Sequence, residues 1–206
     1  MGQSAPVEGF DVTVTGTTDF GAMAESHLVV ITAGLARKPG MSRDDLLAAN
    51  ANIVGPIAER VVRTAPDAVL IVVTNPLDLM VALALRRSGF PRTRVMGMAG
   101  VLDSARLRLF VAERLSVPPT AVQAMVLGSH GDLMVPLRNT ITVNGTPLAQ
   151  LLDPREIDQL LQRTRDGGAE IVSLLKQGSA FYAPASGAVE MAGAILQNRH
   201  AVLPVC

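Results

Sequence analysis

The sequence lacks the residues that define several classes of protein. Its 206 residues contain no tryptophan and one tyrosine. Because Cys206 is the only cysteine in the sequence, no disulfide framework can form within the chain. Only three histidines are present and they are scattered, which argues against a metal site. Lysine plus arginine and aspartate plus glutamate number 18 each and no basic run occurs, so we expect no nucleic-acid partner. No apolar run approaches the length of a bilayer span, so we expect no membrane partner either.

The start of the sequence and the scarcity of cysteine bear on localisation. Residues 1–6 carry neither a charged start nor an apolar stretch, so they do not resemble a secretory signal. Pro6 stands where a myristoylation signal needs serine or threonine. Because 49% of the residues are hydrophobic, the chain has enough apolar material for a sizeable core. We expect a compact protein in the reducing cytoplasm.

In the first half, short β-branched runs alternate with longer amphipathic stretches. This alternation is typical of a parallel sheet covered by helices. Strands are predicted at residues 11–15, 28–32, 69–74 and 95–97. Helices are predicted at residues 43–64 and 76–88. The first contains Gly55-Pro56, where we expect a kink because an interior proline costs about 3 kcal/mol.

The pattern changes after Pro118-Pro119. Residues 122–127 predict a strand, and Asn144-Gly145 is the dipeptide typical of a type I′ hairpin turn. Antiparallel pairing therefore replaces the alternation of strands and helices.

Two further helices are predicted near the end of the sequence. The first runs over residues 154–176, with Asp153 as its N-cap, and Gly167-Gly168 is expected to be a weak point in it. The second covers residues 187–198 and leads into an apolar tail that resembles the start of a strand.

One histidine stands in a setting that favours proton transfer. His130 lies in a glycine-flanked loop that follows an apolar run, and Asp132 is two residues further on. Asp103 and Arg106, earlier in the chain, supply a carboxylate that could orient the imidazole and a cation that could bind an anionic substrate. The three residues together indicate an acid/base site.

Each of these residues has a second interpretation. His130 fits a structural histidine in a turn as well as it fits a catalytic base. Asp103 precedes a helical pattern and could be an N-cap, and Arg106 could be a solvated surface charge. From the residue types alone these alternatives stay open.

Several longer motifs, taken together, carry a family resemblance. They are ITAG at residues 31–34, RKPG at 37–40, RDDLL at 43–47, VTNPLD at 73–78, GMAGVLDSARLR at 97–108 and GSHGD at 128–132. RTRDGGAEIV at 163–172 and GSAFYAPAS at 178–186 fit the same pattern. In this order and spacing the chain resembles the lactate/malate dehydrogenase family, and within it the malate dehydrogenases of the lactate-dehydrogenase-like type. The resemblance covers essentially the whole sequence.

The resemblance implies roles for the acid/base residues and for two more arginines. His130 matches the family's proton-transfer histidine, and Asp103 matches the carboxylate that orients it. Arg106 matches the arginine that binds the substrate's C1 carboxylate with two parallel hydrogen bonds. Arg43 matches an arginine that helps to bind substrate and polarises its carbonyl, and Arg37 falls where malate enzymes bind the distal carboxylate. The implied partner is a small dicarboxylic acid, malate or oxaloacetate.

The resemblance also implies an NAD cofactor. Asn75 matches a residue that contacts both nicotinamide and substrate, and the family's cis peptide would fall at Asn75-Pro76. The remaining residues implied to contact or line the cofactor site are Thr32, Ala33, Gly34, Asn50, Val73 and Thr74.

One part of the family pattern has no counterpart in this sequence. Dinucleotide binding of this kind uses a G-x-G-x-x-G turn and an acidic residue about 20 positions further on. No G-x-G-x-x-G occurs among the 206 residues, and the sequence stops before the family's last strands and helix. We therefore expect a chain truncated at both ends, with its catalytic residues retained.

The expected fold class is α/β. Residues 1–100 would form an incomplete doubly wound, Rossmann-like parallel sheet, the partial NAD-binding domain, and residues 101–206 a partial mixed α+β substrate domain. The resemblance implies a malate dehydrogenase of the tricarboxylic acid cycle that assembles as a homo-oligomer. Two alternatives stay open: a non-catalytic remnant that binds ligands or other subunits, and a lactate dehydrogenase, against which Arg37 argues.

Overall fold

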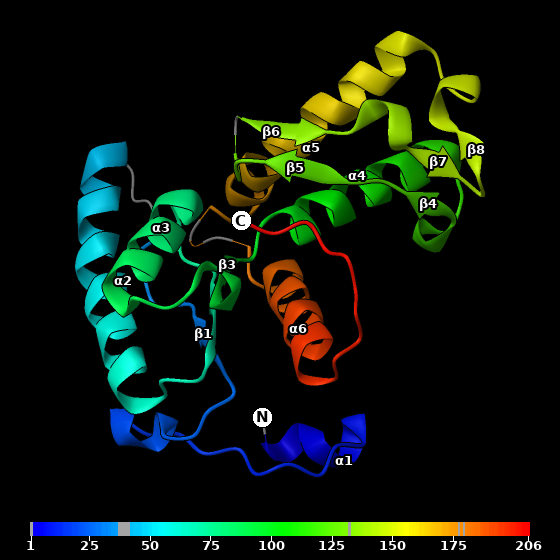
Figure 1. The fold of residues 1–206 in the computed structure, drawn as a ribbon. Coiled ribbons are helices and arrows are strands. Elements are labelled where there is room, and N and C mark those ends of the chain that lie inside the picture. The colour runs from blue at the N-terminus through cyan, green and yellow to red at the C-terminus, as the bar shows by residue number, and fades with distance from the viewer. Residues whose placement is uncertain (1, 37–41, 132, 177, 179) are drawn as a thin grey trace.

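The computed structural model describes residues 2–36, 42–131, 133–176, 178 and 180–206, except for the side chain of Arg43. A parallel sheet of order β1-β2-β3 forms from β1 (Leu28–Ile31), β2 (Val69–Val72) and β3 (Val95–Gly97). Helices α2 (Arg43–Thr64) and α3 (Leu77–Ser88) cover one face of this sheet, and α6 (Tyr182–Leu196) lies on the other (Figure 1).

The alternation of side chains along β2 explains why helices cover both faces. Leu70 and Val72 pack in one buried cluster with residues of α2 and α3. Ile71 points the other way and packs with Met191 of α6. A strand buried on both faces reads as a continuous apolar run, which is the signal that predicted β2.

A reciprocal cap sets the start of α2. The hydroxyl of Ser42 accepts a hydrogen bond from the backbone N–H of Asp45 at 3.0 Å, and the Asp45 carboxylate accepts one from the backbone N–H of Ser42 at 3.1 Å. The hydrogen bond from the Ser42 hydroxyl lowers the pKa of the Asp45 carboxyl below its ordinary value. The helix then continues through Pro56 to Thr64 without interruption.

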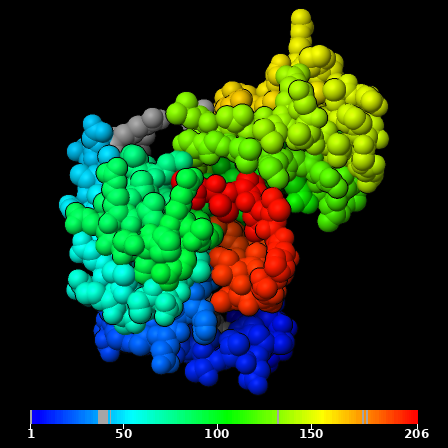
Figure 2. All heavy atoms as spheres, in the orientation of Figure 1, coloured from blue at the N-terminus to red at the C-terminus, as the bar shows by residue number. Residues whose placement is uncertain are grey.

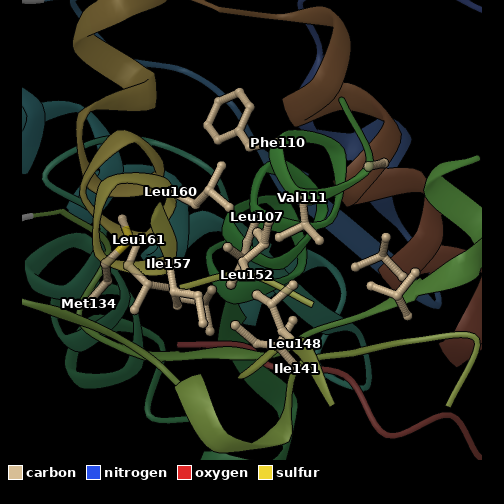
Figure 3. Close-up of a cluster of buried hydrophobic side chains, with 14 residues drawn as sticks. Leu107, Phe110, Val111, Met134, Ile141, Leu148, Leu152, Ile157, Leu160 and Leu161 are labelled. Carbon is tan, nitrogen blue, oxygen red and sulfur yellow. The ribbon is translucent and has the colours of Figure 1, made fainter. Parts of the chain in front are cut away.

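The second half packs around helix α4 (Gly100–Leu115). Strands β4 (Val122–Gln123), β7 (Thr142–Val143) and β8 (Thr146–Pro147) form one antiparallel sheet, and β5 (Val126–Gly128) pairs with β6 (Met134–Pro136). Helix α5 (Pro154–Leu175) packs on α4, and side chains of both helices and of the segment between them form the core shown in Figure 3. That core includes Leu107, Val111, Ile141, Leu148, Ile157 and Leu161.

The remaining elements are short. Helix α1 (Ala5–Glu8) lies near the N-terminus. The 3-10 helices cover Gly2–Ser4, Phe20–Met23, Arg92–Arg94, Pro119–Ala121, Arg138–Thr140 and Leu148–Gln150. None of the described helices is both long and apolar enough to cross a bilayer.

The last residues return to the parallel sheet. The backbone N–H of Gly97 in β3 donates to the carbonyl of Cys206 at 2.8 Å, and the N–H of Cys206 donates to the carbonyl of Gly97 at 3.0 Å. Figure 2 shows this segment, in red, between the first half of the chain and the second.

The structure confirms most of the predicted elements of the first half. The strands at 28–32, 69–74 and 95–97 and the helices at 43–64 and 76–88 are present within a few residues of their predicted bounds. The strand predicted at 11–15 is absent, and its Val12 and Val14 are 65% and 48% exposed.

Two predictions in the second half need correction. The single strand predicted at 122–127 is two strands, β4 and β5, which belong to different sheets. The last helix begins at Tyr182, five residues before its predicted start at Gly187. The predicted hairpin is confirmed, because Asn144 and Gly145 connect β7 to β8 with φ of 48° and 83°.

Candidate active site

His130 and Asp103 form the centre of the candidate site. His130 Nδ1 lies 2.9 Å from Asp103 Oδ2, and the two side chains are 17% and 2% exposed. An ionised carboxylate only accepts hydrogen bonds, so Nδ1 carries the proton in this pair. Nε2 of the same ring is then left to exchange a proton with a ligand.

The turn that carries His130 requires glycine at two places. Gly128 and Gly131 have φ of 79° and 138°, in the region that disfavours residues with a Cβ. A Cβ on Gly128 would also lie 2.8 Å from the carbonyl oxygen of Leu133. The turn joins β5 to β6, and this short hairpin presents the imidazole towards α4.

Arg106 contacts the same carboxylate as His130. Its Nη1 lies 3.1 Å from Asp103 Oδ1, one helical turn away on α4, and its side chain is only 12% exposed. Arg106 Nε is a buried side-chain atom without a hydrogen-bond partner among the described residues. A guanidinium beside a proton-transfer pair suits a ligand carboxylate, which can accept two parallel N–H bonds.

The geometry resolves two of the alternatives that the sequence left open. Asp103 is the fourth residue of α4 and is buried, whereas Ala99 occupies the N-cap, so the N-cap interpretation of Asp103 is wrong. Arg106 is not a solvated surface charge, because it is mostly buried and paired with Asp103.

The residues implied to line the cofactor site lie where β1 and β2 end. Thr32, Ala33 and Gly34 follow β1 and are exposed, and Val73 to Asn75 follow β2. Ligands of doubly wound sheets bind outside the carboxyl ends of the strands, so this is the expected place for the nicotinamide end of a dinucleotide.

These two segments approach each other closely enough to exclude a side chain at Gly34. The hydroxyl of Thr74 donates to the carbonyl of Ala33 at 2.8 Å. A Cβ on Gly34 would lie 2.4 Å from Thr74 Cγ2. Glycine at position 34 is therefore required for the close packing of these two segments.

Asn50 of α2 holds these segments together. Its amide nitrogen donates to the carbonyls of Asn75 at 2.6 Å and Leu35 at 3.1 Å, and its Oδ1 accepts from the N–H of Leu35 at 2.7 Å. The side chain is completely buried. Asn50 thus shapes the crevice through the backbone, a positioning role that the sequence did not predict.

A pocket of about 630 Å³ is lined by both Asn75 and His130. Its lining residues come from the start of α2, the start of α3 and the His130 turn, and they include Asp44, Asn75, Asp78, Ser129 and His130. The peptide bond between Asn75 and Pro76 on its wall is cis, as the resemblance implied.

The two other arginines implied to bind substrate are described only in part. Arg37 lies outside the described residues. Arg43 is the first residue of α2, beside Asp44 on the pocket wall, and its side chain is not described.

Asp78 and Ser129 are site residues that the sequence did not single out as functional. The Ser129 hydroxyl donates to Asp78 Oδ2 at 2.8 Å, and the backbone N–H of His130 donates to the same oxygen at 3.2 Å. The Cys206 thiol donates to Asp78 Oδ1 at 3.5 Å. Burial raises the pKa of this thiol to about 11, and the Asp78 charge and hydrogen bond act in the same direction.

Comparison with protein families assigns both halves of the chain. The family model for the NAD binding domain of lactate/malate dehydrogenases matches residues 3–97, and the model for the alpha/beta C-terminal domain matches residues 100–206. The chain belongs to the lactate/malate dehydrogenase family. The family resemblance and the α/β fold class inferred from the sequence are thereby confirmed.

Individual relatives within this family are malate and lactate dehydrogenases. The malate dehydrogenase of Synechocystis is 54% identical over 96% of this chain and 61% of its own length. The structure of the Salinibacter ruber malate dehydrogenase matches with a TM-score of 0.92 and 49% identity over 98% of this chain and 64% of that one. The Cryptosporidium parvum lactate dehydrogenase, complexed with lactic acid and NAD, matches with a TM-score of 0.94 and 40% identity over 98% of this chain and 66% of that one. The chain thus spans somewhat less than two thirds of these dehydrogenases.

Proposed function

We propose that the protein interconverts malate and oxaloacetate with NAD as the cofactor. The observation that carries the proposal is the buried carboxylate of Asp103, which contacts His130 with one oxygen and Arg106 with the other. This arrangement places a proton-transfer group and an anion-binding group side by side. We also assign residues 1–100 to the NAD-binding part and residues 101–206 to the substrate-binding part.

His130 would move the proton in this reaction. In malate oxidation its Nε2 takes the proton of the substrate hydroxyl, and the positive charge that then develops on the ring is stabilised by Asp103. In the reverse direction the same atom returns the proton to the carbonyl oxygen. When bound, NAD accepts the hydride from the substrate carbon and NADH returns it.

Three groups would hold the cofactor's nicotinamide end and the substrate. Thr32 to Gly34, which are exposed, and Val73 to Asn75 lie at the ends of β1 and β2 and form the crevice. Arg106 binds the carboxylate next to the reacting carbon, and Arg43 assists. The guanidinium of Arg106, beside the His130–Asp103 pair, fits the substrate carboxylate.

A four-carbon dicarboxylate is preferred over a three-carbon acid. Arg37 supplies a cation for the distal carboxylate of the substrate. A three-carbon acid has a methyl group instead of this carboxylate, so the charge of Arg37 would be unpaired. The malate dehydrogenases of Synechocystis and Staphylococcus saprophyticus are 54% and 52% identical to this chain. Lactate dehydrogenase is the second candidate, because lactate dehydrogenases are among the structural relatives.

Three wider properties belong to the same proposal. The tricarboxylic acid cycle is the setting that malate oxidation indicates. The single cysteine is consistent with the cytoplasm. A homo-oligomer is included because the family resemblance implies it.

The proposal is tested with a chimera. The segments of Salinibacter ruber malate dehydrogenase that flank the matched region are joined to this chain, and NADH oxidation is measured with oxaloacetate and with pyruvate. We expect oxaloacetate to be reduced much faster, and Arg37→Gln to shift the preference towards pyruvate. Equal rates with both acids would refute the malate assignment. An unaltered ratio of the two rates in Arg37→Gln would mean that another residue sets the preference for oxaloacetate.

His130→Asn in the chimera separates catalysis from mere binding. This variant should lose activity while retaining its fold, because general acid/base catalysis contributes about 10² to 10⁴ in rate. A chimera that binds NADH but turns over neither acid would instead support the non-catalytic alternative.

A further inference from the structure

The turn that carries His130 is tied to the start of α3 by a single carboxylate oxygen. Oδ2 of Asp78 accepts the Ser129 hydroxyl at 2.8 Å and the backbone N–H of His130 at 3.2 Å. These contacts join residues 51 and 52 positions apart in the chain. They link the helix that follows Asn75-Pro76 to the loop of the proton-transfer histidine.

Among the described residues, the side-chain hydrogen bonds of the His130 turn are those to Asp78 and Asp103. Its backbone is also held by the pairing of β5 with β6 and by the N–H of Met134, which donates to the carbonyl of Gly131 at 3.1 Å. Gly128 and Gly131, on either side of the Ser129-His130 pair, have no side chains that could anchor it. A Cβ placed on Gly131 would meet no atom within 4 Å, so the space around that end of the turn is open. The carboxylate of Asp78 is therefore a principal contact that limits how the backbone of His130 can move.

His130 is consequently held from two directions. Asp103 of α4 fixes the ring through Nδ1, at 2.9 Å, and Asp78 of α3 fixes the main chain through the N–H. Hydrogen bonds to an ionised acceptor are stronger than neutral ones, and a carboxylate has the lone pairs to accept both donors at once. The position of Nε2 relative to the crevice depends on both of these hydrogen bonds.

We propose that Asp78 is a positioning residue for His130. By fixing the backbone of the turn it keeps the imidazole against Asp103 and beside the crevice at Asn75. Ser129 is the second donor that keeps the Asp78 carboxylate in place. The reaction that this arrangement serves rests on the proposed function, whereas the positioning itself rests only on the hydrogen bonds that Asp78 and Asp103 accept.

The test uses the 206-residue chain and requires no turnover. In Asp78→Ala and Asp78→Asn, NMR would measure hydrogen exchange of the His130 amide and the signal of the ring proton between Nδ1 and Asp103. We expect exchange of the amide to rise roughly tenfold or more, because its partner is lost or becomes neutral. We also expect the ring proton signal to shift or broaden. Ser129→Ala should give a smaller change in the same direction.

Asp67→Asn is the matched control. Asp67 is a fully exposed carboxylate in the turn before β2, so its loss removes the same charge without touching the His130 turn. Thermal unfolding of all four variants separates positioning from general destabilisation. If the ring signal is unaltered in Asp78→Ala while the melting temperature falls, Asp78 is only structural and the proposal is overturned.

The result is independent of the proposed function. A changed ring signal in Asp78→Ala together with an inactive chimera would support the positioning role and refute the dehydrogenase. An unchanged amide exchange rate in every Asp78 variant would refute the positioning role, whatever the activity of the chimera.

Discussion

At the scale of single residues, the site depends on how one buried carboxylate is shared. Asp103 contacts His130 with one oxygen and Arg106 with the other, so the carboxylate is shared between the two side chains. The sequence identified these three residues because they occur in recognisable motifs. It did not identify Asp78, because the contacts of that residue span more than fifty positions and no local spacing signals them.

Replacing Asp103 by asparagine should lower turnover of the chimera while the fold is retained. Asparagine neither carries the charge that stabilises a protonated imidazole nor reliably enforces the tautomer with the proton on Nδ1. We expect kcat to fall by about 10² or more. Asp158→Asn, which alters a carboxylate 62% exposed, is the control and should leave kcat unchanged. Wild-type kcat in Asp103→Asn would contradict the role assigned to the pair.

The thiol of Cys206 should react slowly with an alkylating reagent near pH 9. Its pKa is raised from the ordinary 9.0 to about 11, first by burial and then by Asp78, so little thiolate is present there. As the pH rises, the thiol of the unfolded chain loses its proton before the thiol of the folded chain does. The contribution of this thiol to the free energy of unfolding is therefore complete below pH 9.0 and is lost as the pH rises towards 11. Iodoacetamide labelling against pH would measure this. Asp78→Asn should accelerate the labelling. An unaltered rate would mean that burial alone raises the pKa of the thiol.

At the scale of elements, helix α5 shows what the sequence could and could not predict. The pair Gly167-Gly168 suggested a weak point, yet α5 is continuous from Pro154 to Leu175. Packing explains the glycine at position 167, because a Cβ on Gly167 would lie 3.1 Å from Arg106 Cδ. A Cβ on Gly168 would meet nothing within 4 Å.

The two glycines of α5 should therefore respond in opposite ways to alanine. Gly168→Ala gains helix propensity without a clash and should raise the free energy of unfolding by up to about 1 kcal/mol. Gly167→Ala gains the same propensity but must displace Arg106, so we expect no net gain and a raised KM for oxaloacetate in the chimera. Urea unfolding and steady-state kinetics of both variants would measure these effects. Equal stabilisation with an unaltered KM in both would show that Arg106 tolerates the methyl group.

The elements that the sequence mispredicted share a physical cause. Residues 11–15 have strand-forming valines, but β-propensity is realised only when a strand has neighbours to pair and pack with. Residues 122–127 form one apolar run, yet tertiary pairing divides it between β7 and β6. Strand β2 was predictable because burial on both faces leaves a continuous apolar run in the sequence.

At the scale of the whole molecule, α4 connects the two halves. Leu102 near its start packs with Ile71 of β2 and Met191 of α6, and Leu107 and Phe110 pack with the second core. The Ser104 hydroxyl, between these two groups, accepts the backbone N–H of Val126 at 2.9 Å. The helix therefore belongs to both cores, and Asp103 and Arg106 lie at the junction.

Because the two halves share α4, we expect damage to either core to destabilise the whole molecule. Ile71 of β2, in the cluster of Leu102, and Leu107 of α4, in the second core, are both completely buried. Ile71→Ala and Leu107→Ala should each lower the free energy of unfolding by about 2–5 kcal/mol. Calorimetry should show one transition that moves to lower temperature in both variants. A second transition in Leu107→Ala, with the parallel sheet melting at the unaltered temperature, would mean that the two cores unfold independently and that α4 does not couple them.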